Sequence, residues 1–367
     1  MDAQVSFKKG DPITADQAML LAMDVAKRGA PFVSPNPVVG CIVVDRNHCF
    51  LDFGFHPKFG QEHAEINALN KLSPEEIEGS TFYVTLEPCA HQGKTGSCAK
   101  KLATLKPKKV VYGIMDPNPL VLGRGAAILN EAGIEAIEYS GLYKSDLQQL
   151  AEIFVKNFTE QKVFVAAKVA SSLDGQIALK NGESKWITSE ASRVYVHELR
   201  SYYDAILIGS NTIRQDDPAL NIRHPQIKKQ SKLIILDADN QIYKKKFKFM
   251  EVHPHANIYF AVIKKSADNP YQQVEFRSLE GLLEQIWNLE IRSLFIEGGA
   301  QVYTSFFQSG LVDRLYLFMA PSIIGSFNGL SWTSMLKINS LADQMVLRNT
   351  QLKYIGADIF ITGSMKT

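Results

Sequence analysis

Two of the chain's four cysteines, Cys89 and Cys98, lie in the segment TLEPCAHQGKTGSCAK, which is too rich in glycine, polar and basic residues to form a core. His63 lies upstream, in the segment EHAEINAL. One imidazole and two thiolates suit zinc, and three protein ligands leave the fourth tetrahedral position open for water, as in catalytic zinc sites. The residue types therefore predict one catalytic zinc ion per chain, held by these three side chains.

Glu65 follows His63 by two residues, at the start of a segment with helical spacing. In the interior of a helix the two side chains would point to different faces, but in the first turn both can lean toward an ion beyond the N-terminus. Glu65 can then move protons without being a ligand. A helix that begins at Cys98 would direct backbone N–H groups at the site and favour the thiolate over the thiol.

H-x-E followed by P-C-x-x-C is the signature of zinc nucleobase deaminases, in which the glutamate is the general acid and base. This chain departs from it, because eight residues rather than two separate Cys89 from Cys98. The alternatives are a closed structural zinc site, with His91 or His56 as fourth ligand, or two unrelated buried thiols. A closed site gives no reason for Glu65, so we favour the catalytic interpretation.

The other two cysteines are predicted to be packing residues. Cys41 lies in the apolar strand-like segment VVGCIVV, and Cys49 follows a turn. Small sulfur side chains in such places usually behave as hydrophobic residues.

Composition limits the classes of protein that remain. The 367 residues suggest two domains, and the formal net charge of +2, from 40 basic and 38 acidic residues, gives no footprint for broad nucleic-acid binding. No apolar run is long enough to cross a bilayer, and the first residues lack the apolar stretch of a secretory signal. Four cysteines in a chain of this length fit a reducing compartment. We therefore expect a cytoplasmic protein with neither nucleic-acid nor membrane partners.

Helical and strand-like segments alternate along the chain, which indicates α/β architecture. The first part has a helix predicted over 14–29, with Thr14 as N-cap, and a connecting helix is predicted over 145–162. We place the boundary within about 145–162 and divide the chain into domains 1–152 and 153–367. The other helices are predicted at 63–72, 125–133, 189–202, 279–287 and 301–308. The strands are predicted at 38–45, 80–87, 108–116, 164–172, 204–213, 231–239, 256–263, 292–299, 313–321 and 352–363.

Two local signals in the second part bear on ligand binding. Asp174 and Gly175 form a hairpin-turn signal between two strand-like runs, and Thr188 or Ser189 could cap the helix that follows. FIEGG leads from a strand into a helix, an arrangement that can present backbone N–H groups to a phosphate, although a glycine pair there more often relieves crowding. No G-x-G-x-x-G follows an early strand, so a Rossmann fingerprint is absent.

Four segments resemble a known family. SPNPVVG, GFHPKFGQEHAE, TLEPCAHQGKTGSC and MDPNPLVLGRG occur in the order and spacing of the deaminase domain of the bifunctional riboflavin-biosynthesis deaminase–reductase family, whose loop between the cysteines is equally long. The resemblance implies a cytidine-deaminase-like three-layer α/β/α fold. It also implies that Asn36, His56 and Lys94 contact the pyrimidine or its ribose-phosphate. Turn chemistry would account for Asn36 equally well, and a solvated loop for Lys94.

Five later segments, ASSLDG, NGESKWIT, GSNTIRQDDPALNIR, IEGGA and DRLYLFMAPSIIG, resemble the reductase domain of the same family, which has a dihydrofolate-reductase-like α/β fold and uses NADPH. The two resemblances together cover about residues 14–364. Matched by motif position, the residues that would line the NADPH site are Ala170, Trp186, Thr212, Asp216, Gly299, Ala300, Gln301, Val302, Tyr303, Thr304 and Ser305. Those that would hold the ribosyl-phosphate substrate are Ser184, Arg200, Leu220, Arg223 and Glu297.

The residue types agree with these roles without proving them. A planar guanidinium binds a dianionic phosphate bidentately, which suits Arg200 and Arg223. Without the resemblance, Arg200 would be interpreted as a surface cation at a helix end and Trp186 as a core residue. No residue is identified by its pattern as the proton donor of the reductase.

The resemblance implies two successive reactions on a phosphorylated pyrimidine. The first is zinc-dependent hydrolytic removal of the 2-amino group from 2,5-diamino-6-(5-phosphoribosylamino)pyrimidin-4(3H)-one, with Glu65 transferring protons. The second is NADPH-dependent reduction of the ribosyl side chain, which gives 5-amino-6-(5-phosphoribitylamino)uracil. The family also implies a homo-oligomer, a dimer or a tetramer.

Two other functions compete with this one. A deaminase acting on a base in RNA or DNA would need an electropositive channel or stacking aromatic residues, and the near-neutral charge argues against it. A protein with one vestigial domain, acting as a nucleotide binder or a structural zinc module, should have lost part of the site. His63, Glu65, Cys89 and Cys98 are all present.

Overall fold

The computed structural model describes residues 7–90, 96–118, 121–225 and 227–365. Contacts divide the chain between Gln161 and Lys162 into an N-terminal and a C-terminal unit. Each unit is built around its own mixed β-sheet with helices packed against it. The predicted fold class, two α/β domains, is confirmed.

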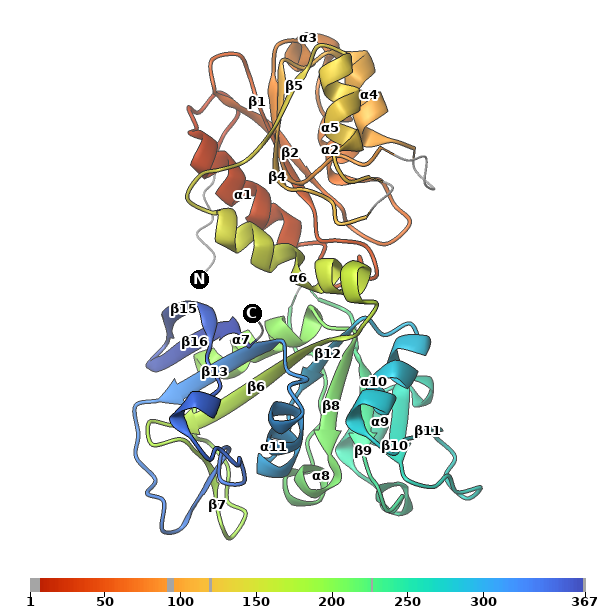
Figure 1. The fold of residues 1–367 in the computed structure, drawn as a ribbon, viewed down its shortest axis with the longest axis vertical. Coiled ribbons are helices and arrows are strands. Elements are labelled where there is room, and N and C mark those ends of the chain that lie inside the picture. The colour runs from red at the N-terminus through yellow and green to blue at the C-terminus, as the bar shows by residue number, and fades with distance from the viewer. Residues whose placement is uncertain (1–6, 91–95, 119–120, 226, 366–367) are drawn as a thin grey trace. The chain divides into compact units, whose positions relative to one another are not determined.

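The N-terminal unit contains one five-stranded sheet in the order β2-β1-β3-β4-β5. β1 is antiparallel to β2 and β3, whereas β3, β4 and β5 run parallel. Figure 1 shows α1 on one side of this sheet and α2, α4 and α5 on the other, which is the predicted three-layer arrangement. The strands are β1 (Gly40–Val44), β2 (Phe50–Phe55), β3 (Thr81–Leu86), β4 (Lys109–Ile114) and β5 (Glu135–Glu138). The helices are α1 (Ala15–Lys27), α2 (Ala64–Leu69), α3 (Pro74–Ile77), α4 (Cys98–Leu105), α5 (Arg124–Glu131) and α6 (Lys144–Glu160).

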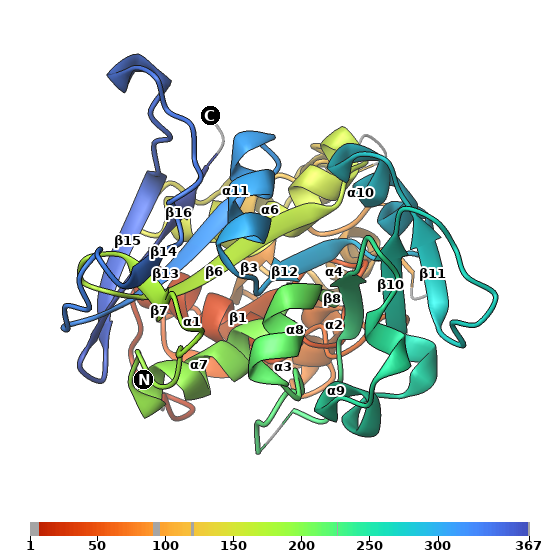
Figure 2. The same ribbon diagram turned by 90° about the horizontal axis from the view of Figure 1, so that it is seen from below.

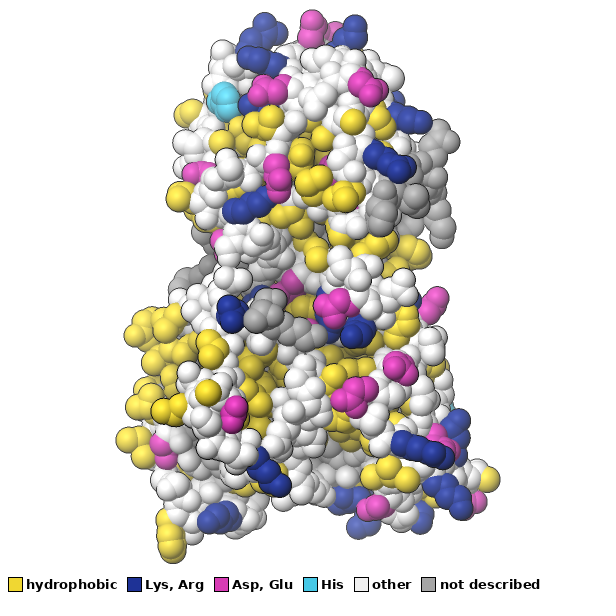
Figure 3. All heavy atoms as spheres, viewed as in Figure 1, with side chains coloured by type: hydrophobic (Ala, Val, Ile, Leu, Met, Phe, Trp, Pro, Cys, Tyr) yellow, Lys and Arg dark blue, Asp and Glu magenta, His cyan; other side chains and the backbone are white. Residues whose placement is uncertain are grey.

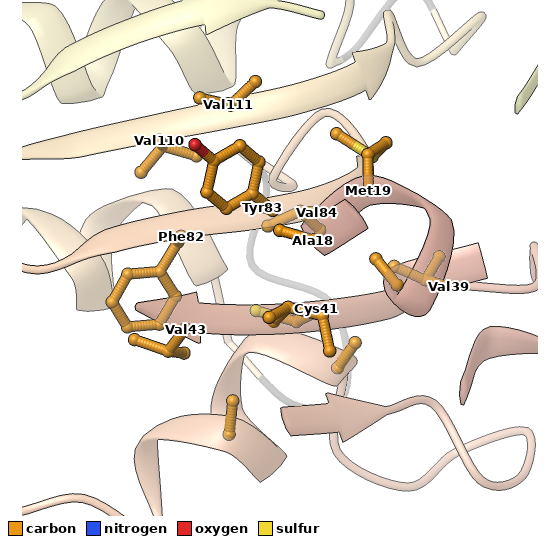
Figure 4. Packing of buried hydrophobic residues seen from close by; sticks show 14 of the residues in the cluster. Ala18, Met19, Val39, Cys41, Val43, Phe82, Tyr83, Val84, Val110 and Val111 are labelled. Atoms are coloured by element: carbon orange, nitrogen blue, oxygen red, sulfur yellow. The ribbon is translucent and has the colours of Figure 1, made fainter. Parts of the chain in front are cut away.

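Local sequence accounts for the first of these elements. Thr14 is the N-cap of α1, and its side chain and that of Gln17 bond reciprocally to each other's backbone N–H groups, so the predicted cap is confirmed. Cys41 is fully buried on β1, in the cluster of β1, β3, β4 and α1 side chains that Figure 4 shows. Its predicted packing role is therefore confirmed. Cys49 is only half-buried, just before β2.

Gly54 fixes the position of α2 on the sheet. A Cβ atom at this β2 residue would overlap the carbonyl oxygen of Ala64 and the backbone nitrogen of Ala68, so the helix backbone lies directly on the strand. Ala64 stands between His63, the N-cap of α2, and Glu65 in its first turn. The close approach therefore places both candidate site residues at the edge of the sheet.

The C-terminal unit contains a nine-stranded sheet in the order β11-β10-β9-β8-β12-β6-β13-β16-β15. The strands from β11 to β13 are parallel, and β16 and β15 continue the sheet as antiparallel strands. The strands are β6 (Phe164–Ser172), β8 (Ala205–Gly209), β9 (Lys232–Leu236), β10 (Ile258–Val262), β11 (Gln272–Glu275), β12 (Ser293–Ile296), β13 (Arg314–Ala320), β15 (Arg348–Ile355) and β16 (Asp358–Ser364).

Helices cover both faces of the larger sheet. Figure 2 shows α10 and α11 on one side and α7, α8 and α9 on the other. Two separate clusters of buried side chains fill these two interfaces. The helices are α7 (Glu190–Ser201), α8 (Ser210–Asp216), α9 (Lys248–Val252), α10 (Leu279–Asn288) and α11 (Ala300–Gln308). No helix among the described residues is both long and apolar enough to cross a membrane.

Three sequence predictions are partly wrong in this unit. The single strand predicted over 352–363 is two antiparallel strands, β15 and β16, joined by a turn at Gly356, whose φ is +59°. The turn at Gly175 is present, with φ at +79°, but β7 (Gln176–Leu179) pairs with β14 (Gly329–Ser331) instead of forming a hairpin with β6. The Asp174 carboxylate accepts the N–H groups of Ile324 and Gly325, which ties the turn to a distant segment. The strand predicted over 204–213 ends at Gly209, because α8 begins at the next residue and buries Ile213.

Candidate functional site

The three predicted metal ligands meet at one point of the N-terminal unit. The Nδ1 atom of His63 lies 3.6 Å from Sγ of Cys89 and 3.4 Å from Sγ of Cys98. Tetrahedral zinc, with bonds of about 2.3 Å to sulfur and about 2.0 Å to nitrogen, holds such atoms about 3.6 Å apart. The donor set therefore fits zinc. No other group of three or more potential metal-ligating side chains is found among the described residues.

The start of α4 holds Cys89 in place. The backbone N–H of Cys98 donates to Sγ of Cys89 at 3.3 Å, and the Ser97 hydroxyl and the Ala99 N–H donate to the Cys89 carbonyl at 2.8 and 3.2 Å. Cys98 is the first residue of α4, with Ser97 as N-cap, so the predicted helix start is confirmed. Cys89 is thus joined to the first residues of α4 and their N-cap by three hydrogen bonds.

The electrostatic environment favours one thiolate before any metal is considered. The hydrogen bond from Cys98, together with His63, lowers the pKa of Cys89 to about 4 despite burial. The hydrogen bond with Cys89 is the main cause that raises the pKa of Cys98, and burial raises it further. The contact with Cys89 raises the pKa of His63. A dication at this point would hold both sulfurs as thiolates, since coordinated thiols are deprotonated outright.

Glu65 lines the same cavity of about 270 Å³ as His63 and Cys89, and its side chain is buried. Burial raises its pKa above the ordinary range of a carboxyl group. Other side chains complete the cavity, and they include Asn36, His56, Phe59, Glu87, Asp116, Asn118, Phe154 and Phe158. A buried carboxyl group therefore lines the same cavity as the metal ligands.

His56 is bonded at both ring nitrogens. Nδ1 lies 3.0 Å from the Glu62 carbonyl oxygen and Nε2 lies 3.0 Å from Nδ2 of Asn36. The carbonyl requires a proton on Nδ1, so Nε2 accepts from the Asn36 amide. Burial lowers the pKa of His56, which agrees with a neutral ring. His56 is therefore occupied and is not the fourth ligand of a closed zinc site; His91 and Lys94 lie outside the described residues.

A second cavity, of about 500 Å³, opens in the C-terminal unit at the carboxyl ends of parallel strands β6, β8 and β12. Ligands of open α/β sheets commonly bind at this edge. The five residues predicted for substrate all line it: Ser184, Arg200, Leu220, Arg223 and Glu297. Of those predicted for the cofactor, the ones that line it are Ala170, Trp186, Thr212, Asp216, Gly299 and Tyr303.

The remaining residues predicted for the cofactor lie on α11 but do not line this cavity. They are Ala300, Gln301, Val302, Thr304 and Ser305. Ala300 and Thr304 are buried, whereas Gln301 and Ser305 are exposed. Gly299, the N-cap of α11, and Tyr303 in its second turn are thus the residues through which this helix reaches the cavity.

Charged side chains neutralise one another on the wall of the second cavity. Arg200 binds the Glu297 carboxylate bidentately through Nε and Nη2, and Lys168 Nζ lies 4.0 Å from Glu297 Oε2. Burial would raise the pKa of Glu297, but the charges of Arg200 and Lys168 hold it at about 2. His197 lies between the two guanidinium groups of Arg200 and Arg223. Burial and these two cations lower the pKa of His197 to about 4.

Comparisons with known proteins bear on both units. Residues 13–114 match the cytidine and deoxycytidylate deaminase zinc-binding region, and residues 163–361 match the RibD C-terminal domain. The riboflavin biosynthesis protein RibD of Aquifex aeolicus is 36% identical over 94% of this chain and 96% of its own length. Its counterpart in Escherichia coli strain K12 is 32% identical over 93% and 96%. The chain belongs to the RibD family.

Solved RibD structures extend the likeness to the whole fold. One form of Acinetobacter baumannii RibD superposes with a TM-score of 0.81 at 34% identity, covering 95% of this chain and 98% of that one. A Thermotoga maritima protein described as a diaminohydroxyphosphoribosylaminopyrimidine deaminase and 5-amino-6-(5-phosphoribosylamino)uracil reductase gives 0.82 at 32% identity, with the same coverage. The predicted membership is thus confirmed, and with it a zinc-binding deaminase unit joined to a reductase unit.

Sequence reasoning missed several residues of these RibD-family sites. In the first cavity Glu87 gave no signal, because its carboxylate accepts hydrogen bonds from backbone N–H groups, which no sequence pattern reveals. In the second cavity it missed Lys168 and His197. Lys168 could have been found, since it is the only charged residue in the apolar strand FVAAKVASS. His197 could have been found as the residue one helical turn before Arg200.

Proposed function

We propose that this chain removes an amino group from a phosphoribosylated diaminopyrimidine in its N-terminal unit and reduces the ribosyl side chain of the product in its C-terminal unit. The observation that carries the proposal is the convergence of His63, Cys89 and Cys98 beside Glu65 in one cavity. The name of the Thermotoga maritima relative supplies the two substrates. The family combines a deaminase and a reductase of riboflavin biosynthesis.

In the first reaction His63, Cys89 and Cys98 would hold zinc, which when bound lowers the pKa of a water molecule to about 7. Glu65 takes one proton from the attacking water and passes it to the pyrimidine ring nitrogen next to C2, as the C–O bond forms at C2. Glu65 then takes the proton of the new hydroxyl group and gives it to the amino group, so that the C–N bond breaks, ammonia leaves and a carbonyl group remains at C2. Asn36 and His56, fixed against each other, hold the base beside Glu65.

In the second reaction NADPH supplies the hydride when bound, and the chain's own residues bind and orient the two ligands. Trp186 is 70% exposed at the second cavity, with the Arg193 guanidinium 4.4 Å above its ring, so it offers an open surface for a ligand and does not pack in the core. Arg200 is already paired with Glu297. Arg223 is exposed, so its guanidinium group is the one that can donate hydrogen bonds to a phosphate dianion.

The proposal is tested by measuring three quantities on purified protein supplied with the diaminopyrimidine phosphate: bound zinc, released ammonia and oxidised NADPH. We expect one zinc per chain, ammonia release without NADPH, and NADPH oxidation only after deamination. Zinc without ammonia release would contradict the proposal and point to a structural metal or another base. A shift of single-stranded oligonucleotides would favour a nucleic-acid deaminase.

We further propose that the chain forms a homo-oligomer through one open face of the larger sheet. Two cross-strand rows on β13, β16 and β15 carry only apolar side chains: Leu317, Ile361 and Leu352 in one row, and Met319, Ile359 and Tyr354 in the other. None of the six is buried, and Leu352 and Tyr354 are 64% and 72% exposed. Figure 3 shows hydrophobic side chains gathered over this part of the unit.

The opposite face of the same strands is covered, because Phe318 and Phe360 pack on Tyr195 of α7. Among the described strands β15 pairs with β16 alone, so its outer edge is also open. An apolar face without charged side chains can be covered by the same face of a second copy of the chain, related to the first by a two-fold axis. Apolar sheet faces of this kind pack face to face in proteins.

Sedimentation velocity checks the interface. Leu352→Glu should convert the oligomer into smaller species, while Ile263→Glu, at another exposed apolar site just beyond β10, should leave it unchanged. A wild-type chain that sediments as a monomer at micromolar concentration would contradict the proposal. So would an oligomer that Leu352→Glu leaves intact.

The four cysteines are free thiols, which agrees with a reducing compartment. We therefore infer a cytoplasmic location for the chain. Cell fractionation that finds it outside the cytoplasm would contradict this.

A further inference from the structure

Glu87 lies between β3 and Cys89, and its carboxylate is buried with only 2% of the residue exposed. Oε2 accepts the backbone N–H groups of Asp116 at 3.3 Å and Gly123 at 3.0 Å, and Oε1 accepts that of Ala126 at 3.2 Å. The N–H of Glu87 itself donates to the Ile114 carbonyl at 2.9 Å. One side chain therefore joins β3 to the segment after β4 and to the first turn of α5.

The carboxylate replaces a missing helix cap. Gly123 is the N-cap of α5, has a φ of +73° and offers no capping side chain. Ala126 is the third residue of that helix, the position whose N–H an N-cap side chain would ordinarily satisfy. A negative charge at this end is also favoured by the helix dipole. Glu87 thus holds α5 by a cap supplied from another element.

α5 in turn touches the backbone that leads to Cys89. A Cβ atom at Gly125 would overlap the carbonyl oxygen of Pro88, and it would lie 3.2 Å from Oε1 of Glu87. The residue at 125 must therefore be a glycine for α5 to lie against Pro88. Cys89 is thereby held from two sides, by the start of α5 through Glu87 and Pro88 and by the start of α4 through its carbonyl group.

The same carboxylate fixes one wall of the first cavity. It accepts the N–H of Asp116, and Asp116 Oδ1 accepts the N–H of Asn118 at 2.8 Å. Both residues line the cavity that contains Glu65 and the metal ligands. A single anchor therefore sets the position of a metal ligand and of the wall that faces the substrate.

We propose that Glu87 is a positioning residue of the deaminase site, which sets Cys89 and the 116–118 wall together through its backbone hydrogen bonds. The proposal rests on the zinc site proposed above. Partners one step removed from a metal ligand commonly change metal affinity or activity by about 10- to 100-fold when mutated. Glu87 should act within this range without touching the reacting atoms.

Glu87→Gln is the informative variant, because it keeps the shape of the side chain and replaces one acceptor oxygen with an amide nitrogen. That nitrogen must face at least one backbone N–H, so at least one of the three hydrogen bonds is lost. Asp16→Asn is the matched control. Asp16 is a half-buried carboxylate of the same unit whose Oδ1 accepts the Tyr139 hydroxyl, and it does not line the cavity.

The measurement is competition for zinc alone against a chelator, together with the absorption spectrum of the cobalt-substituted protein and the kcat and KM of ammonia release. For Glu87→Gln we expect zinc affinity about tenfold lower or worse, a changed cobalt spectrum and a raised KM. Asp16→Asn should match wild type in all three. NADPH oxidation with deaminated substrate should be unchanged in both variants, which reports that the C-terminal unit is intact, and a wild-type circular dichroism spectrum reports that the N-terminal unit is folded.

Gly125→Ala tests the same anchor from its other side and should weaken zinc binding in the same direction. It keeps the proposal testable if Glu87→Gln does not fold. Wild-type zinc affinity, spectrum and KM in both Glu87→Gln and Gly125→Ala would overturn the proposal. A wild-type chain that binds no zinc would instead overturn the proposed function, so the two failures are distinguishable.

Discussion

The two candidate sites of this chain are assembled in different ways. In the N-terminal unit the metal ligands come from the N-cap of α2, the loop after β3 and the first residue of α4, and two of the three, Cys89 and Cys98, are only nine positions apart. In the C-terminal unit Lys168, Arg200 and Glu297 come from β6, α7 and the end of β12, which meet only when the large sheet forms. One site is largely local, and the other is wholly tertiary.

The difference also extends to charge. At the first site two thiols and an imidazole form a cluster that gains stability when a dication binds. At the second site the positive charges already have a carboxylate partner in Glu297. The first site is therefore expected to depend on an added ion, and the second on its own internal ion pairs.

Removing a metal ligand should have the largest effect. Cys98→Ser should abolish zinc binding and lower ammonia release by at least about a thousandfold, because the activated water is lost. Reduction of the deaminated substrate should stay within twofold of wild type. Metal analysis and the two separate assays check this, with Cys49→Ser as the control for a thiol outside the cluster. Loss of both activities together would break the distinction between the two sites.

Breaking the ion pair of the second site should be the next largest effect. Glu297→Gln leaves Arg200 and Lys168 without their buried partner, which should lower the stability of the C-terminal unit by about 3–5 kcal/mol. Its thermal transition should fall while zinc affinity is unchanged. Calorimetry checks this against Glu284→Gln, an exposed carboxylate on α10. An unchanged transition would mean that the ion pair does not hold the site together.

The pH dependence of stability should show a smaller effect. Arg200, Arg223 and Glu297 face His197, whose pKa is lowered from 6.5 to about 4. As the pH falls from 6.5 toward 4 the unfolded chain binds a proton before the folded unit does, so the unit loses stability over this window and is unaffected by this group above it. Urea titrations at several pH values check this.

His197→Gln should flatten that dependence in part. A smaller slope should remain from His253, whose pKa burial also lowers. His255→Gln serves as the control and should keep the wild-type slope. Equal slopes in wild type and His197→Gln would contradict the assignment.

The residues of the N-terminal site could be predicted from the sequence more fully than those of the C-terminal site. The spacing of His63, Glu65, Cys89 and Cys98 indicated zinc chemistry from residue types alone, because few other arrangements use those side chains together. The roles of Arg200 and Glu297 could be predicted only from the resemblance to a family, since a lone arginine on a helix is usually a surface residue. Glu87 was beyond either route, as its partners are backbone groups whose positions only the fold determines.

Fold prediction failed where distant segments redirected the chain. β7 joins β14 because Asp174 binds the 324–325 segment, and no local pattern near residue 174 indicates this. α8 begins where a β-branched run predicted continued strand, because Ile213 is needed in the core beneath the sheet. The strongly periodic segments, such as α1 with its capping box, were predicted correctly because their signals are local.

The central claim is that two independent sites act in a fixed order on one substrate, with Glu65 required only for the first. The direct test is NADPH oxidation by Glu65→Gln protein, given either the diaminopyrimidine phosphate or its deaminated product. We predict a wild-type rate with the deaminated product and no oxidation with the diamino compound, while one zinc per chain is retained. Oxidation of both compounds at the wild-type rate, or of neither by a folded zinc-bound protein, would contradict the account.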